Sequence, residues 1–220
     1  AHTVSFTLDW HSQDRRWEFK ATPYYTRVTD YIDAMRCTDG ASCTEANATT
    51  TDQFVVLQYV NQPARIYGID LYGHMPLAKI DWGRFGLNGV LNYTNGKNLD
   101  TDDGLYNVMP LNATLILTHQ HGGWDNALEL VLAHRKDDVS EVRNEIKTPG
   151  YGLLNLRGSY SWKQARVDFG IENLFDKLYY LPTGGAYTGQ GRTMAINGIP
   201  WGIAVPGKGR SVYTAVSFKF

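Results

Sequence analysis

Hydrophobic and polar side chains alternate with a period of two along most of this chain. In the C-terminal segment one face is oily and the other carries mostly small or polar residues; the oily face holds Val212, Thr214, Val216, Phe218 and Phe220. The same alternation recurs in residues 85–94, 154–162 and 166–172. No stretch of a dozen residues keeps the 3.6-residue period of an amphipathic helix. The pattern therefore predicts an almost entirely β structure.

Short and long connections alternate between these segments. Polar turns lie near residues 12–15, 79–82, 121–125 and 163–164, and long polar loops lie near residues 33–52, 96–107, 136–148 and 177–208. The alternation holds only if residues 54–77 form one long strand bent around Pro63, and not a hairpin turning at Asn61 and Gln62. We take the bend, because proline is tolerated at bulges and edges, and expect about nine strands.

Strands of about ten residues, with short turns at one end and long loops at the other, are typical of an outer-membrane β-barrel. Hydrocarbon offers no hydrogen-bond partner, so strands cross it only when their backbones pair with one another. The 14 tyrosines and 6 tryptophans suit the boundary between oil and water. A soluble sandwich or lipocalin-like barrel is the competing interpretation. Its outer face would hold rows of Asn, Ser, Thr and Gly with few Lys and Glu, which counts against it.

Composition narrows the classes of protein further. The longest apolar runs are about four residues, far short of a transmembrane helix. The formal net charge of −1 argues against nucleic acid as the main partner, because a phosphate footprint requires clustered basic residues. Cys37 and Cys43 lie in a polar stretch, where a small disulfide in an oxidising compartment is the first interpretation and two free thiols or metal ligands the second.

The last third of the chain carries a specific resemblance. Residues 167–179 contain the run Asn-Leu-Phe-Asp-Lys-Leu-Tyr, and residues 207–220 read Gly-Lys-Gly-Arg-Ser-Val-Tyr onward to a terminal Phe. These segments resemble the last two strands of TonB-dependent outer-membrane transporters. Residues 68–71, Gly-Ile-Asp-Leu, are similar to a stretch of the same family.

The resemblance implies a transmembrane antiparallel barrel of 22 strands around a plug domain. About nine strands with a free edge at each end do not close a barrel, so we expect residues 1–220 to be its C-terminal part, without the plug and N-terminal strands. By the same analogy, Phe218 and Phe220 form the signal that the barrel-assembly machinery recognises. The implied partners are outer-membrane lipid and lipopolysaccharide, and the TonB–ExbB–ExbD energy-coupling complex acting through the missing N-terminal region. The implied location is the outer membrane of a Gram-negative bacterium.

The expected function is active import of a scarce metal or metal chelate, with this segment forming barrel wall and outer loops. Residues 144–151, 181–187 and 197–202 resemble members assigned to copper or other metals, which favours copper. A ferric-siderophore or cobalamin receptor, or a passive porin-like channel, is the alternative. No nucleophile stands beside a base at a catalytic spacing, so we expect no enzyme, with an outer-membrane protease or lipase as the competing class. We expect no resident cofactor, since the metal or chelate is the transported ligand.

Two sets of residues are candidates for function. Soft sulfur ligands favour Cu(I), and the candidates are Met35, Cys37, Cys43 and Met194. Packing for the methionines and a disulfide for the cysteines is the alternative. Four charged residues are expected to face the lumen and pair with one another or contact the plug: Arg157, Arg166, Asp168 and Glu172.

Overall fold

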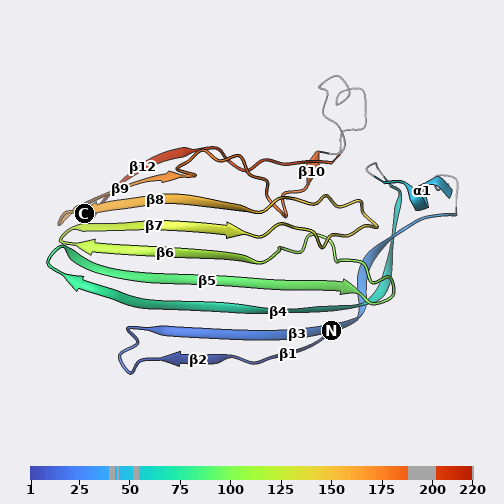
Figure 1. The fold of residues 1–220 in the computed structure, drawn as a ribbon, viewed down its shortest axis with the longest axis horizontal. Helices are drawn as coiled ribbons and strands as arrows, with labels where there is room; N and C mark the ends of the chain where they lie inside the picture. Colours follow the sequence, from blue (N-terminus) through green and yellow to red (C-terminus); the bar gives the residue numbers. More distant parts are fainter. Residues whose placement is uncertain (40–42, 44, 52–54, 188–201, 220) are drawn as a thin grey trace, which may run out of the picture.

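The computed structural model describes residues 1–39, 43, 45–51, 55–187 and 202–219. These residues form one large antiparallel sheet with a small hairpin beside it (Figure 1). The main strands are β1 His2–Ser5, β2 Leu8–His11, β3 Glu18–Arg36, β4 Leu57–Ile80, β5 Gly83–Asn98, β6 Asn112–His121, β7 Trp124–Ala133, β8 Tyr151–Ser161, β9 Ala165–Glu172 and β12 Ser211–Phe218. The hairpin pairs β10 Ala186–Tyr187 with β11 Ile203–Ala204, and α1 spans Glu45–Thr49.

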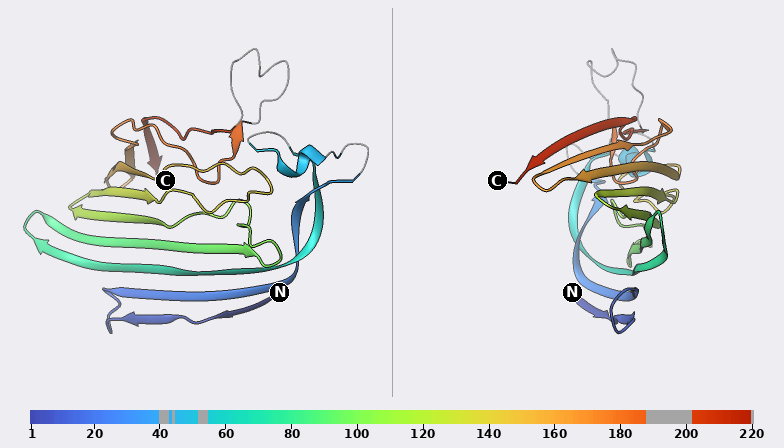
Figure 2. Two further views of the ribbon diagram at one scale, coloured as in Figure 1. Left: turned by 45° about the vertical axis from the view of Figure 1, so that its right-hand side comes forward. Right: turned by 90° about the vertical axis from the view of Figure 1, so that its left-hand side faces the viewer.

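The main sheet has the order β1-β3-β4-β5-β6-β7-β8-β9-β12. Because β2 also pairs with β3, β1 and β2 share one edge, and the sheet has the nine strand positions predicted. The end-on view in Figure 2 shows the sheet curved into an arc. Within the described residues, neither the β1/β2 edge nor the outer edge of β12 has a partner. No described helix is long and apolar enough to cross a bilayer.

The bend predicted at Pro63 is confirmed, because β4 is a single strand of 24 residues that runs through it. The register between β3 and β4 shifts between Val28 and Tyr31, and Pro63 lies in the opposing gap, where no ladder bond requires its missing N–H. Its carbonyl instead accepts a bond from the Leu99 N–H at 2.8 Å. Beyond this bulge β3 and β4 bend away from the direction of the other strands, toward α1 (Figure 1).

The register keeps each face chemically uniform across the sheet. One rung consists of residues on seven neighbouring strands, every one of them apolar: Met75, Leu87, Leu117, Leu128, Leu156, Ile171 and Val212. The adjacent rung on the opposite face includes His74, Asn88, Ile116, Glu129 and Asn155. A slip of one residue in any strand would move its apolar side chains to the polar face of the sheet, so the apolar rung fixes the register.

Burial is inverted relative to a soluble protein. Glu129 is 8% exposed and Ser159 3%, whereas Phe169 is 43% and Val216 56% exposed. The chain exposes 14330 Å², against about 10,000 Å² for a compact soluble monomer of this mass. The apolar face therefore needs a hydrocarbon cover, and the soluble sandwich lacks its second layer in the described part of the chain.

The Asn-Leu-Phe-Asp-Lys run forms a hydrogen-bonded turn after β9. Asn173 and Asp176 adopt left-handed backbone conformations, with φ of 49° and 53°, which Asn and Asp tolerate. The Asn173 side chain donates to the carbonyls of Lys177 at 2.9 Å and Lys208 at 3.2 Å, and Asp176 Oδ1 accepts from the Arg210 N–H at 2.8 Å. The run therefore joins the end of β9 to the approach to β12, and its role is architectural.

The assignment of faces is tested by two neighbouring aliphatic residues of β6. Leu117→Arg places a charge in the apolar rung, and we expect it to lower the free energy of unfolding by about 2–4 kcal/mol. Ile116→Arg places the same charge opposite Glu129 on the polar face, so we expect a much smaller loss. Urea unfolding of the receptor in lipid vesicles measures both, and equal losses would contradict the orientation.

Candidate functional site

Four long loops gather at one end of the sheet and form the candidate site (Figure 1). They connect β3 to β4, β5 to β6, β7 to β8, and β9 to β12, and span residues 37–56, 99–111, 134–150 and 173–210. We call them the first to fourth loops. The connections at the other end are short, spanning residues 12–17, 81–82, 122–123 and 162–164, so the predicted separation of long loops from short turns is confirmed.

Arg36, the last residue of β3, ties the first loop to the third. Its guanidinium donates to the carbonyls of Ala48 at 3.0 Å and Thr50 at 2.7 Å in the first loop. It also donates to the carbonyls of Glu141 at 2.9 Å and Val142 at 3.0 Å in the third. The planar guanidinium, with its five N–H donors, thus binds the backbone of two segments about a hundred residues apart. The compact ammonium group of a lysine would not reproduce this set of bonds.

A buried ion pair links the remaining loops. Lys136 and Glu145 face each other with side chains 1% and 8% exposed. The Lys136 ammonium also donates to the Pro182 carbonyl of the fourth loop at 3.2 Å, and Glu145 accepts from the Asn107 N–H of the second loop at 3.0 Å. Glu145 further accepts from the Ser140 N–H at 2.8 Å. Because both charges are satisfied inside one low-dielectric cluster, the second, third and fourth loops are held as one unit.

Arg143 of the third loop lies between two aromatic rings. Its guanidinium carbon is 5.0 Å from the centroid of Tyr106 and 5.6 Å from that of Tyr59, and one nitrogen lies 3.7 Å from Asp33. Asp33 in turn accepts a bond from the Asn98 side-chain amide at 2.9 Å. Cation–π and ionic contacts therefore attach the third loop to the second loop and to the extended ends of β3 and β4.

The linked loops enclose an open recess of about 1020 Å³. Its wall comes from the end of β3 and from all four loops, and includes Met35, Arg36, Thr101, Glu141 and Lys147. The volume lies at the upper limit for pockets that bind small molecules. The wall mixes cationic, anionic and thioether groups, so the recess can contact a polar chelate as well as a soft metal.

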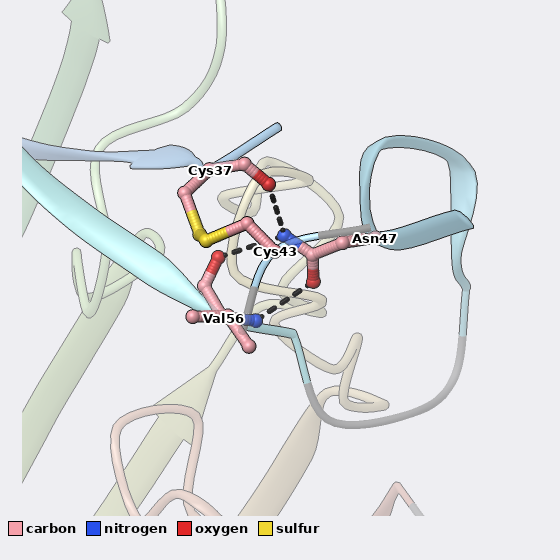
Figure 3. Close-up of a disulfide and its surroundings, with 4 residues drawn as sticks. All are labelled: Cys37, Cys43, Asn47 and Val56. Carbon is pink, nitrogen blue, oxygen red and sulfur yellow. Dashed lines mark hydrogen bonds between the residues drawn. A yellow bond between two sulfur atoms is a disulfide. The ribbon is translucent and has the colours of Figure 1, made fainter. Parts of the chain in front are cut away.

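The predicted sulfur ligands are only partly brought together. Met35 is 36% exposed and lines the recess. Cys37 and Cys43 are joined as a disulfide in the structure, with Cα atoms 5.5 Å apart, so neither offers a thiolate (Figure 3). Met194 lies outside the described residues. Among the described residues, no three His, Cys, Asp or Glu side chains form a metal-binding cluster.

Asn47 of α1 braces the disulfide, a contact that sequence reasoning missed. Its side-chain amide donates to the carbonyls of Cys37 at 2.8 Å and Val56 at 2.9 Å, and its Oδ1 accepts from the Val56 N–H at 2.8 Å (Figure 3). This one side chain therefore closes the base of the first loop where β3 ends and β4 begins.

The residues predicted to face the lumen share the polar face. Arg157 contacts Glu129 at 2.9 Å and Arg166 contacts Asp168 at 2.8 Å, so Arg157, Arg166 and Asp168 each have a charged partner on that face. Glu172 stands opposite Ser211 in the same alternation. The sequence had suggested Arg157 and Arg166 as partners for the two carboxylates; Glu129 was not among its candidates.

The predicted assembly signal is only partly visible. Phe218 is 66% exposed and pairs with Ala165 at the turn end of β12. Phe220 lies outside the described residues.

A single curved sheet with an apolar outer face, a polar inner face and long loops at one end defines a wall of an outer-membrane β-barrel. The chain belongs to the TonB-dependent receptor-like β-barrel family, and the model of that family matches residues 1–174. Its relatives are receptors and transporters of the Gram-negative outer membrane, not enzymes. The long loops of such barrels are extracellular.

Named relatives differ in cargo. The chain is 26% identical over 198 residues to heme/hemopexin utilization protein C of Haemophilus influenzae, covering 85% of this chain and 27% of the relative. It is 24% identical over 204 residues to the ferric aerobactin receptor of Escherichia coli, covering 84% and 26%. The solved structure of the copper transporter OprC is similar with a TM-score of 0.79 and 25% identity, covering 99% of this chain and 31% of OprC. The chain thus spans about a quarter to a third of the length of these proteins.

The buried ion pair gives a prediction for the loops. Lys136→Met leaves Glu145 buried without its cation, and we expect the local stability of the third loop to fall by about 3–5 kcal/mol. Arg135→Gln, one residue earlier, removes an exposed pair with Asp137 and costs about 0–1 kcal/mol. Hydrogen exchange of residues 134–150 measures both. Similar exchange rates in the two variants would show that the ion pair does not hold the loops.

Proposed function

We propose that residues 1–220 form the C-terminal part of a longer TonB-dependent receptor with a plug domain and a 22-stranded barrel. Two observations support this. The sheet has two edges without partners in the described residues, and exposed edges inside a bilayer leave backbone groups unsatisfied. The named relatives are also three to four times longer than the region they share with this chain.

The receptor imports a scarce metal or metal chelate, and copper is the favoured cargo. The similarity to the copper transporter OprC over 99% of this chain carries the assignment. Met35 in the wall of the recess adds a thioether of the kind that Cu(I) prefers. Met194 is the second proposed sulfur ligand. The cysteines would join them only after reduction of the disulfide.

A ferric chelate or heme is the second candidate cargo. The curated relatives include a ferric aerobactin receptor and a heme/hemopexin utilization protein. The recess of about 1020 Å³ is also large for a bare ion, and Arg36 and Lys147 in its wall supply positive charge for an anionic chelate.

Energy for import comes from the TonB–ExbB–ExbD complex acting on the N-terminal region of the whole receptor. The barrel-assembly machinery recognises the C-terminal strand.

We expect uptake of radioactive copper by cells carrying the receptor to fall to background when the energising complex is deleted, because a plugged barrel opens only when energy is supplied. Uptake that persists without the complex would identify a passive channel. A ferric siderophore taken up in place of copper would support the second cargo.

The role of Met35 is tested against a methionine on the lipid face. Met35→Leu keeps the volume and removes the thioether, and we expect the KM for copper uptake to rise at least about tenfold, as for the loss of a metal-supporting group. Met75→Leu, in the apolar rung, is the matched control and leaves the KM unchanged. A normal KM in Met35→Leu would remove this residue from the copper path.

A further inference from the structure

A row of basic side chains crosses three neighbouring strands at the loop end of the sheet. Arg27 of β3 stands directly opposite Arg65 of β4, and Arg65 stands opposite Lys97 of β5. Side chains that face each other in this way have Cβ atoms about 4.5–5.5 Å apart. Two guanidinium groups and one ammonium group are therefore placed within reach of a single anion.

The row lies on the lipid-facing side of the barrel. Two residues nearer the membrane centre on the same face, Tyr25 pairs with Tyr67, and one further rung along, Ile69 pairs with Tyr93. Tyrosines at this position mark the boundary between hydrocarbon and headgroups. The basic row is one rung beyond the tyrosines, toward the extracellular loops. It is therefore level with the headgroups of the outer leaflet.

The protein itself leaves most of this charge uncompensated. Within the described residues Arg27 and Arg65 form no ion pair, and Arg65 Nε is shielded from solvent without a hydrogen-bond partner. Lys97 alone has a carboxylate, Asp102, at 3.7 Å. Like charges directly opposite each other destabilise a sheet. An anion from outside the chain would remove that cost and supply the missing partner.

We propose that Arg27, Arg65 and Lys97 form a binding site for the phosphate groups of a phosphorylated glycolipid of the outer leaflet, the lipid A part of lipopolysaccharide. A phosphate offers oxygens to both guanidinium groups at once, in the planar geometry that arginine matches. The acyl chains of the same lipid would extend down the apolar face below the tyrosines. The site rests on the orientation of the sheet in the membrane and is independent of the cargo.

The test measures lipid binding by the full-length receptor in detergent, using native mass spectrometry with added lipid A. We expect Arg27→Gln/Arg65→Gln to weaken lipid A binding about thirtyfold, from the contribution of two basic residues near an anionic surface. Arg15→Gln/Arg16→Gln is the matched control, because it removes the same charge from the turn end of the barrel. The control keeps the affinity of the unaltered receptor.

Ligand variants decide the chemistry without any mutation, which covers the case in which the double variant fails to assemble. Lipid A stripped of both phosphates should bind the unaltered receptor as weakly as intact lipid A binds the double variant, and inorganic phosphate should compete only at far higher concentration. Equal binding of intact and dephosphorylated lipid A would overturn the proposal, as would equal losses in the two double variants. Competition by inorganic phosphate at lipid concentrations would indicate a free-anion site and reject the lipid.

Discussion

Every strand in this sheet has to satisfy its backbone hydrogen bonds with another strand, because hydrocarbon supplies neither donors nor acceptors. The unbroken ladder from β1 to β12 follows from that constraint. Once the ladder exists, the pleat sends alternate side chains to opposite faces, and the seven-residue apolar rung through Leu117 faces lipid. The polar face can then hold paired charges such as Arg157 with Glu129, which a soluble protein of this size would place on its surface.

The tightly packed part of the described chain is at the loop end, not in the barrel wall. The largest of its fully buried side chains are Lys136, Leu105, Asn98 and Ser140, all at or near the loops. The long loops of such barrels extend beyond the bilayer, so the protein's own contacts have to stabilise them. Arg36 and the Lys136–Glu145 pair do this with charge-assisted hydrogen bonds to backbone, which fix geometry as well as contributing energy. A recess surrounded by such links keeps its shape without a second sheet behind it.

The most recognisable motif of the chain and the recess proposed to receive the cargo are built from different residues. Asn173 and Asp176 belong to the most recognisable motif. Their hydrogen bonds fix the chain between β9 and β12, and neither residue lines the recess. A motif of this kind identifies the barrel, whatever the barrel transports. We propose that the cargo is recognised by the recess, whose wall beyond Met35 and Arg36 comes from the long loops. Loops vary more among related proteins than the strands they connect. Such a division of roles agrees with the similarity of this one chain to relatives named for heme, aerobactin and copper.

The sequence alone determined the strands, their faces, the bend at Pro63 and the separation of long loops from short turns, because a period of two and the positions of turn residues are local properties of the chain. It also brought Cys37 and Cys43 into one candidate disulfide, since only five residues separate them. It did not identify Arg36, Lys136 or Glu145 as the residues that join the loops. Nor did it place Arg27, Arg65 and Lys97 in one row. Those associations join residues tens of positions apart, and only the strand register and the folding of the loops decided which of them meet.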